Sequence, residues 1–421
     1  MATREAATSA IIDLRTIRSQ FPALAETFHG HAAVYFDAPG GTQVPQRVID
    51  AISDYLVHSN SNTHGQFHTS QRTDEVMTGA HAAMADMLGC DADEIAFGQN
   101  MTTLTFALSR ALGCDLREGD EIVTTLLDHD ANVAPWRALE ERGVKVHAVK
   151  FKPEDCTLDL HDLQSKLSSR TKIVAVGYAS NAVGTINPVK QIVAMAHEVG
   201  ALVFVDAVHY APHGAIDVRD LNCDFLACST YKFFGPHMGV LYGKREHLLR
   251  LKPYKVRPAA DTLPDRWETG TLNHECIAGI TACVEYLADL GRKAAPTVNS
   301  RRAAILAAYA WMQQHEHELA EQLIRGLLEI PGLTFYGIRD LNRLSERTPT
   351  VSIRLKDISP AELSRRLGEL GIYTWDGNFY AMNLTEQLGV EDSGGILRIG
   401  LAHYATSEEV DRLLAALRNM R

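Results

Sequence analysis

An aspartate and a lysine stand 26 residues apart, each at the end of a short apolar segment typical of a buried strand. Asp206 ends the segment LVFVD, and Lys232 follows the segment FLAC in the string STYK. A lysine can form a Schiff base with an aldehyde cofactor, and a nearby carboxylate can keep a pyridine nitrogen protonated so that the ring withdraws electrons. Pyridoxal phosphate requires both groups. The two residues alone would also fit a structural ion pair.

A third strand-like segment, at residues 94–97, leads into residues suited to a phosphate group. The loop 98–101 connects it to Thr102 and Thr103, which begin a predicted helix. The free N–H groups of a helix N-terminus attract anions, and the two hydroxyls can add hydrogen bonds. Threonine and asparagine at this place also fit plain N-caps of the helix.

Histidine and asparagine side chains follow two further strand-like segments. His129, in DHDAN, could stack its flat imidazole on a cofactor ring, or it could belong to a loop that caps a helix. Asn181, in SNAVGT, could donate a hydrogen bond to a ring oxygen or occupy a turn. No further ligands accompany His129, so we expect no metal site.

These residues can meet only if the strand-like segments share one sheet. Short apolar runs alternate with stretches of helical period from about residue 90 to 245. This pattern predicts an α/β fold with a mostly parallel sheet covered on both faces, in which ligands bind beyond the carboxyl ends of the strands. The predicted strands are 94–97, 121–125, 145–149, 173–178, 202–206 and 225–228, and the predicted helices are 103–111, 132–142 and 189–199.

A smaller α+β unit is predicted toward the C-terminus. A charged, proline-containing stretch at 252–266 ends the alternating pattern, and helical segments fill residues 277–329. The predicted elements beyond are strands 350–354 and 397–401 and helices 360–370 and 407–418. We therefore divide the chain into an N-terminal segment 1–34 packing on the small domain, a large domain 35–285 and a small domain 286–421.

Composition and charge exclude several classes of protein. The 421 residues carry 52 acidic and 41 basic side chains, a net charge of −11 without a dense basic cluster, so we expect no nucleic-acid partner. No apolar run approaches the roughly 18 residues of a membrane helix, and we expect no membrane association. The N-terminus lacks a secretory signal pattern and the seven cysteines form no CxxC pair, which favours a cytoplasmic location and reduced thiols. Small molecules are the expected partners.

Other familiar motifs are missing or weak. The chain contains no GxGxxG, GxSxG or HExxH pattern, and residues 239–244 only approximate a P-loop, because the spacing is short and Arg245 replaces the Ser/Thr. The string HEHE at 315–318 has metal-ligating residue types. On a long charged helix, however, this pattern is typical of a solvated face, which is the interpretation we favour.

A series of motifs along the chain is similar to a known family. DHDAN, SNAVGTINP, VDAVHYAPH, STYKFFGP, WETGTLN and LRIGLAHYAT occur in this order, and AVYFDAPGGTQVPQRVIDA precedes them. In this combination the chain resembles the class V aminotransferase family of fold type I pyridoxal phosphate enzymes, most closely its cysteine desulfurase-like branch, from about Tyr35 to the C-terminus. The resemblance implies a mostly parallel, seven-stranded type of sheet in the large domain, a smaller α+β domain and a homodimer.

The resemblance also implies a role for individual residues. Lys232 would hold the cofactor as a Schiff base and act as general base, Asp206 would pair with the pyridine nitrogen, and His129 would stack on the ring. Asn181 and Arg398 would bind the substrate carboxylate, for which a guanidinium is geometrically apt. The cofactor-binding residues that it implies are Lys232, Asp206, His129, Thr102, Thr103, Asn181, His209, Ser229 and Thr271. Of these, Thr102, Thr103 and Ser229 would bind the phosphate, together with Thr271 from the partner subunit.

The chain departs from the family pattern at several places. His209 stands where the family usually has glutamine, and could still face the phenolic oxygen of the cofactor, whereas Tyr231 stands where it usually has histidine. Desulfurases use a mobile small-domain cysteine to attack the substrate sulfur, but this chain has no cysteine beyond Cys283. The corresponding segment, 375–381, reads WDGNFYA, and its Trp375 and Tyr380 could be core or interface aromatics or could close a pocket over an apolar substrate.

We therefore expect an enzyme that uses pyridoxal 5'-phosphate to remove the Cα proton of a small amino acid. A β-elimination or C–S lyase that lacks the persulfide cysteine ranks first, because sulfur can leave by elimination without a protein thiol. An aminotransferase or an epimerase is the alternative, since all three reactions begin with loss of the Cα proton. A catalytically inactive, cofactor-binding subunit is less favoured because Lys232 and Asp206 are both present.

Overall fold

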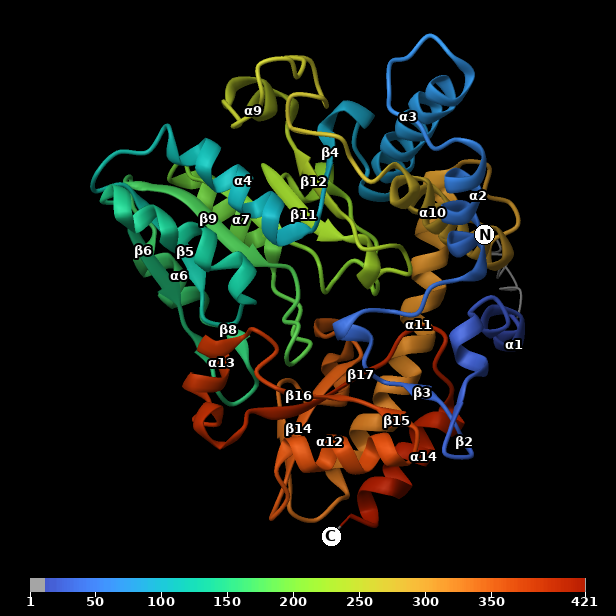
Figure 1. Cartoon of the computed structure of the whole chain (residues 1–421). Coiled ribbons are helices and arrows are strands. Elements are labelled where there is room, and N and C mark those ends of the chain that lie inside the picture. The colour runs from blue at the N-terminus through green and yellow to red at the C-terminus, as the bar shows by residue number, and fades with distance from the viewer. Residues whose placement is uncertain (1–11, 421) are drawn as a thin grey trace, which may run out of the picture.

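A seven-stranded sheet forms the centre of the larger part of the molecule in the computed structural model, which describes residues 12–420 (Figure 1). Its strands, in spatial order, are β4 (Ile95–Gly98), β12 (Gly239–Gly243), β11 (Phe225–Ser229), β10 (Leu202–Asp206), β9 (Thr171–Gly177), β5 (Glu121–Thr125) and β6 (Lys145–Val149). The last five run parallel, whereas β12 pairs antiparallel with β11 and β4. The prediction of an α/β fold with a mostly parallel sheet is confirmed.

Helices cover both faces of this sheet because successive residues of a strand point to opposite sides. Along β10, Val203 and Val205 belong to one hydrophobic core, whereas Phe204 between them belongs to another. Trp136 and residues of α4 fill the second core. The helices of this part are α2 (Gln46–His58), α3 (His68–Leu88), α4 (Met101–Gly113), α5 (Ala134–Arg137), α6 (Leu160–Lys166), α7 (Val189–Glu198), α8 (Val218–Leu221), α9 (Arg245–Arg250) and α10 (His274–Ala294).

A four-stranded antiparallel sheet forms the centre of the smaller part, drawn in orange and red in Figure 1. Its strands, in spatial order, are β13 (Leu333–Tyr336), β14 (Thr350–Leu355), β17 (Ile396–Gly400) and β16 (Trp375–Gly377). A separate hydrophobic core joins this sheet to α11, α12 and α14. The helices of this part are α11 (Arg301–Leu328), α12 (Pro360–Glu369), α13 (Met382–Gln387) and α14 (Ser407–Arg418). The helix α10 crosses the predicted boundary between residues 285 and 286. The division into domains remains a prediction.

The described residues near the N-terminus contact both parts. Arg18 forms an ion pair of 2.7 Å with Glu409 of α14, whereas Phe21 belongs to a core of the larger part. The elements here are α1 (Leu14–Arg18), the short strands β1 (Thr27–Phe28) and β2 (His31–Ala32), and β3 (Val34–Tyr35), which pairs in parallel with β15 (Ile372–Tyr373). Residues 1–11 of the predicted segment 1–34 lie outside the described residues.

Two predicted elements of the larger part differ from the structure. The predicted helix 132–142 is divided into a 3-10 turn, the short helix α5 and a second 3-10 turn, because Pro135 has no N–H to continue a helix that begins before it. The strand β12 was not predicted. Glycine at both ends lowers the strand propensity of this segment. The three residues between the glycines are too few to show a periodic pattern.

The prediction of a solvated face for residues 315–318 is wrong at Glu316. This side chain is 1% exposed, and its Oε2 lies 2.9 Å from Nδ1 of His213. The reason is that α11 packs against α10 on one side and α14 on another, so that few of its faces reach solvent. Within residues 12–420, no group of three His, Cys, Asp or Glu side chains could hold a metal ion, and no helix is long and apolar enough to cross a bilayer.

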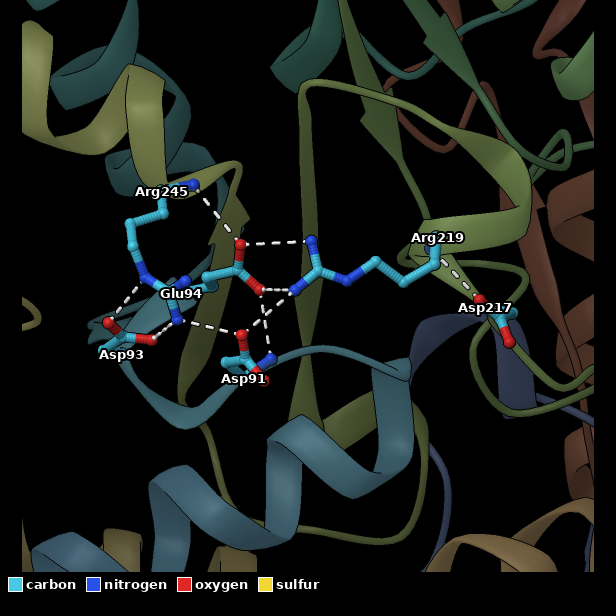
Figure 2. A network of polar contacts seen from close by, with 6 residues as sticks. All are labelled: Asp91, Asp93, Glu94, Asp217, Arg219 and Arg245. Atoms are coloured by element: carbon cyan, nitrogen blue, oxygen red, sulfur yellow. Dashed lines mark hydrogen bonds and ion pairs between the residues drawn. The ribbon is translucent and has the colours of Figure 1, made fainter.

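A charged network anchors the beginning of β4, the strand that leads to the predicted phosphate loop. Figure 2 shows Glu94 between the side chains of Arg219 and Arg245. Glu94 is buried and accepts hydrogen bonds from the Arg219 guanidinium and from the main-chain N–H groups of Asp91 and Arg245. The Arg245 guanidinium instead pairs with Asp93 at 2.7 Å, near the surface.

We expect Arg219→Ala to lower the free energy of unfolding by about 1–2 kcal/mol, because it leaves the buried Glu94 carboxylate without its cationic partner. Arg245→Ala is the matched control, since its side chain pairs with exposed carboxylates and such pairs contribute little. Urea denaturation of the two variants checks the difference. Equal losses would contradict the importance of burial at Glu94.

Candidate active site

A cavity of about 1430 Å³ opens between the carboxyl ends of the large-sheet strands and residues 375–398 of the smaller part. Of the ten predicted site residues, nine line it: Thr102, Thr103, His129, Asn181, Asp206, His209, Ser229, Lys232 and Arg398. The tenth, Thr271, is exposed and does not line the cavity of its own protomer. The parallel strands explain this convergence, because their carboxyl ends meet at one edge of the sheet.

Asp206 and Lys232 follow the neighbouring parallel strands β10 and β11. Asp206 is buried, its Oδ1 accepts a hydrogen bond of 2.9 Å from the N–H of Val208, and burial raises the pKa of its carboxyl to about 6. Burial, together with the Arg398 charge, lowers the pKa of the Lys232 amine to about 7. A large fraction of this amine is therefore neutral, and nucleophilic, near neutral pH.

The start of α4 combines a helix cap with hydroxyl groups that line the cavity. Asn100 caps the helix: its Oδ1 accepts a hydrogen bond from the N–H of Thr103 at 2.9 Å, and its carbonyl accepts one from the Thr103 hydroxyl. Ser229 accepts a hydrogen bond from the N–H of Met101, which leaves its own hydroxyl proton available to an anion. Both predicted uses of these residues, cap and phosphate site, are therefore compatible. A Cβ at Gly239 would lie 2.4 Å from the Asn100 backbone, so only glycine permits this approach.

His129 presents a neutral ring to the cavity. Its Nδ1 accepts a hydrogen bond from the N–H of Ala131 at 3.0 Å, so the proton of the neutral ring lies on Nε2. Burial and the charge of Lys232 lower its pKa to about 4. The ring lies 5.3 Å from that of Tyr380 at an interplanar angle of 25°. A flat, uncharged ring is the form suited to stacking on another aromatic group.

Arg398 and Asn181, the predicted carboxylate-binding residues, contact each other in the cavity wall. The Nη1 of Arg398 donates to the carbonyl of Asn181 at 2.9 Å, and the Phe379 ring covers the guanidinium at 4.1 Å. Two buried atoms, Nε of Arg398 and Oδ1 of Asn181, have no hydrogen-bond partner among the described residues. Burial lowers the pKa of Arg398 to about 9, yet it remains charged at neutral pH. A buried, incompletely paired guanidinium is suited to an anionic ligand.

His209 also lies in the cavity wall and is held by the smaller part. Its Nε2 lies 3.1 Å from the hydroxyl of Thr348. Burial keeps its pKa well below the usual value, so the imidazole is neutral. Asp37 was not among the predicted site residues. Burial raises the pKa of its carboxyl to about 6, and it lies in the electrostatic field of Lys232 and Arg398. Its position after the apolar string AVYF was the available signal.

The cysteines lie away from the cavity. Within the described residues, which include all seven, no cysteine lines it. Cys228 is buried. Burial and the negative charge of Asp206 raise the pKa of its thiol far above the usual value. Such a thiol is a poor nucleophile.

The residues of this cavity fit pyridoxal phosphate. A lysine that can form a Schiff base and a buried carboxylate follow adjacent strands, a neutral imidazole faces the same space, and hydroxyls stand at a helix N-terminus. The unpartnered Nε–H of the buried Arg398 guanidinium adds a donor for a second anion, such as the carboxylate of an amino acid. Together these side chains match the aldehyde, pyridine and phosphate groups of the cofactor and the carboxylate of an amino-acid substrate.

Comparisons with known proteins give the same assignment. The model of the family described as Aminotransferase class-V matches residues 34–413. A cysteine desulfurase of Synechococcus elongatus is 33% identical over 97% of this chain, which spans 64% of that protein. A probable cysteine desulfurase of Halalkalibacterium halodurans is 32% identical over 95% of this chain and 96% of the relative, and the aminotransferase-like protein FGM3 of Gibberella zeae is 32% identical over 97% and 98%.

Solved structures agree with this result. The apo structure of a cysteine desulfurase from Thermococcus onnurineus matches 100% of this chain and 99% of its own length, with a TM-score of 0.84 and 26% identity. A cysteine desulfurase from Escherichia coli matches 97% of this chain and 98% of its own, with a TM-score of 0.82 and 26% identity. The predicted fold type and family are confirmed. The chain belongs to the class V aminotransferase family and is a cysteine desulfurase-like pyridoxal 5'-phosphate enzyme.

Proposed function

We propose that this enzyme is a C–S lyase that eliminates sulfur from the β-carbon of an amino acid without forming a persulfide on the protein. The observation that carries the proposal is that the predicted cofactor residues line a cavity that no cysteine lines within residues 12–420. A desulfurase must deliver a thiolate to the substrate sulfur. Elimination needs only loss of the Cα proton and departure of the sulfur.

The side chains of the cavity divide the work of this reaction. Arg398 and Asn181 bind the substrate carboxylate and so orient Cα. When bound, pyridoxal phosphate supplies an electron sink that stabilises the negative charge left on Cα. Lys232, with its pKa near 7, can take the Cα proton, and Asp206 holds the positive charge of the pyridine nitrogen by electrostatic attraction.

The alternatives use the same first step. An aminotransferase or an epimerase would also need Lys232, Asp206 and Arg398, and nothing about these three residues separates the reactions. Elimination ranks first because two of the three relatives named above are cysteine desulfurases or probable cysteine desulfurases, whose reaction also breaks a C–S bond. An inactive subunit ranks last, because Lys232 and Asp206 are both present and both line the cavity.

A homodimer is part of this proposal. Thr271 is exposed and lies outside the cavity of its own protomer, which is compatible with a role at the phosphate site of a partner subunit. The helix α2 exposes the apolar side chains of Ile49, Leu56 and Val57, of which Val57 is 73% exposed. Apolar surface of this kind on one helix is typical of a face that is covered in an assembly.

L-Cysteine tests the lyase proposal directly. We expect pyruvate, ammonia and sulfide as products, with uptake of one water, and no persulfide on any of the seven cysteines. A persulfide-selective label followed by peptide mass spectrometry measures the second part. Cys276→Ala is the matched control, because its half-buried thiol lies near the site in sequence and its removal should leave the rate unchanged. A catalytically competent persulfide on any cysteine would restore a desulfurase assignment.

A further inference from the structure

Two aromatic side chains of the smaller part form an apolar wall of the active-site cavity. Trp375 is 51% exposed and Tyr380 is 71% exposed, and both line the cavity. Aromatic residues bury a large apolar surface, and they are enriched where proteins contact apolar ligands. Exposure of both inside one cavity therefore marks a place for an apolar group of the substrate.

Hydrogen bonds fix the chain that carries this wall. The N–H of Asp130 donates to the Tyr380 carbonyl at 2.7 Å, and Nδ2 of Asn181 donates to the Phe379 carbonyl at 2.9 Å. The N–H of Tyr380 donates to Oδ1 of Asn378 at 3.1 Å. Phe379 and Tyr380 have φ angles of 55° and 59°, which bulky residues adopt only where the surroundings impose them. These contacts hold the segment against the loops that follow β5 and β9.

The wall adjoins the groups that bind the reacting part of the substrate. Phe379 lies under the guanidinium of Arg398, and the next residue, Tyr380, stacks on His129. Trp375 packs so closely on Gly40 that a Cβ there would lie 2.6 Å from its indole nitrogen. A substrate whose carboxylate is bound by Arg398 therefore has the aromatic wall within reach of its side chain.

We propose that Tyr380 and Trp375 receive a large apolar or aromatic group, and that the substrate is a cysteine S-conjugate whose sulfur carries this group. The proposal rests on the lyase function above. The cavity, at about 1430 Å³, exceeds the roughly 300–1,000 Å³ of common ligand pockets, so a cofactor and a bulky substrate can share it. An S-conjugate also has no terminal sulfur atom to transfer, which agrees with the position of the cysteines outside the cavity.

The reaction balances without an oxidant or a reductant. Lys232 takes the Cα proton, the Cβ–S bond breaks, and its electron pair leaves with the sulfur as a thiolate. The thiolate takes a proton from solvent while Lys232 returns its proton to solvent, and the remaining three-carbon fragment takes up one water to give pyruvate and ammonia. The sulfur substituent leaves unchanged, so the aromatic wall contributes only binding and orientation.

Two pairs of amino acids test the proposal on the holoenzyme. L-Homophenylalanine has the shape of S-phenyl-L-cysteine with a methylene in place of sulfur, and L-2-aminobutyrate has that of cysteine, so both bind without eliminating. Titration followed by the cofactor's absorbance gives their dissociation constants. We expect L-homophenylalanine to bind at least about tenfold more tightly, because the phenyl group is transferred from water to the wall.

Variants assign this preference to the wall. Tyr380→Ala should reduce the difference between the two ligands to about threefold or less, whereas Tyr380→Phe should keep it. Tyr254→Ala is the matched control, because Tyr254 is 67% exposed but does not line the cavity. The affinity for L-2-aminobutyrate should stay within about twofold in every variant, which shows that the fold and the carboxylate site are intact.

The outcomes separate this inference from the lyase function. Equal affinity for the two ligands, or a preference that survives both Tyr380→Ala and Trp375→Ala, would overturn the aromatic site even if L-cysteine is cleaved. A Tyr380→Ala protein that dissociates in light scattering and loses affinity for both ligands alike would assign Tyr380 to a subunit interface instead. If the preference depends on Tyr380 but S-phenyl-L-cysteine releases no thiophenol, the aromatic site stands. The lyase reaction and the proposal of an S-conjugate substrate are then contradicted.

Discussion

Lys232→Ala should give a colourless protein that no longer holds the cofactor covalently and whose turnover falls by at least about 10²–10⁴-fold, the usual contribution of a general base. The physical reason is that one amine both anchors the cofactor and takes the Cα proton. Borohydride reduction of the wild-type protein, followed by peptide mapping, should place the cofactor on the peptide that contains Lys232. Absorbance and product assays measure the two losses.

The surface variant Lys190→Ala is a suitable control, because its amine is exposed and pairs with Asp220. It should keep both colour and rate. A Lys232→Ala protein that still showed the absorbance of a lysine-linked cofactor would refute the assignment.

The pH profile gives a second readout of the same residue. Lys232 must be unprotonated to take a proton, and burial places the pKa of its amine at about 7. The rate of Cα proton removal should therefore fall about tenfold per pH unit below that value and level off above it. A rate that stays constant as the pH falls from about 7.5 to about 5.5 would contradict this role.

Asp206→Asn should slow Cα proton removal by a hundredfold or more, in line with the 10²–10³-fold that one buried electrostatic group typically contributes. Asparagine has nearly the same shape, so cofactor binding can persist, but the negative charge opposite the pyridine nitrogen is lost. Exchange of the Cα proton of a substrate analogue for deuterium measures this step separately from product release. Near-wild-type exchange would contradict the role of Asp206, whereas weaker cofactor binding alone would not.

Asp220→Asn is the matched control for this substitution. Its carboxylate is exposed, pairs with Lys190 at the surface and does not line the active-site cavity. The exchange rate should be unchanged. A comparable loss in both variants would show that general instability, and not the buried charge, causes the effect.

Much of the large sheet could be predicted from the sequence. Residues 121–125, 145–149 and 202–206 were predicted as strands with the bounds that the structure shows, although β6 (145–149) is a partly exposed edge strand. The strand β12 could not be found in this way, because its pairing with β11 and β4 compensates for its weak intrinsic propensity.

The candidate site followed partly from the same argument. The order of the strands brings the residues after them to one edge, which is why nine of the ten predicted residues line one cavity. The aromatic wall was left open between a core, an interface and a ligand contact. Tyr380 of this wall stacks on His129, a residue more than 200 positions away in the sequence, so this contact carries no local signal. Its neighbour Phe379 contacts Arg398, which lies about 20 positions away.

The sequence by itself determined the chemistry that this chain can attempt: a lysine and a carboxylate at strand ends, and no cysteine beyond Cys283. Tertiary structure alone decided how strongly those groups act. Burial by distant segments moves the pKa of Lys232 to about 7 and that of His129 to about 4. The desolvation of a charge depends on every atom packed around it, and residue types and spacing do not specify that packing.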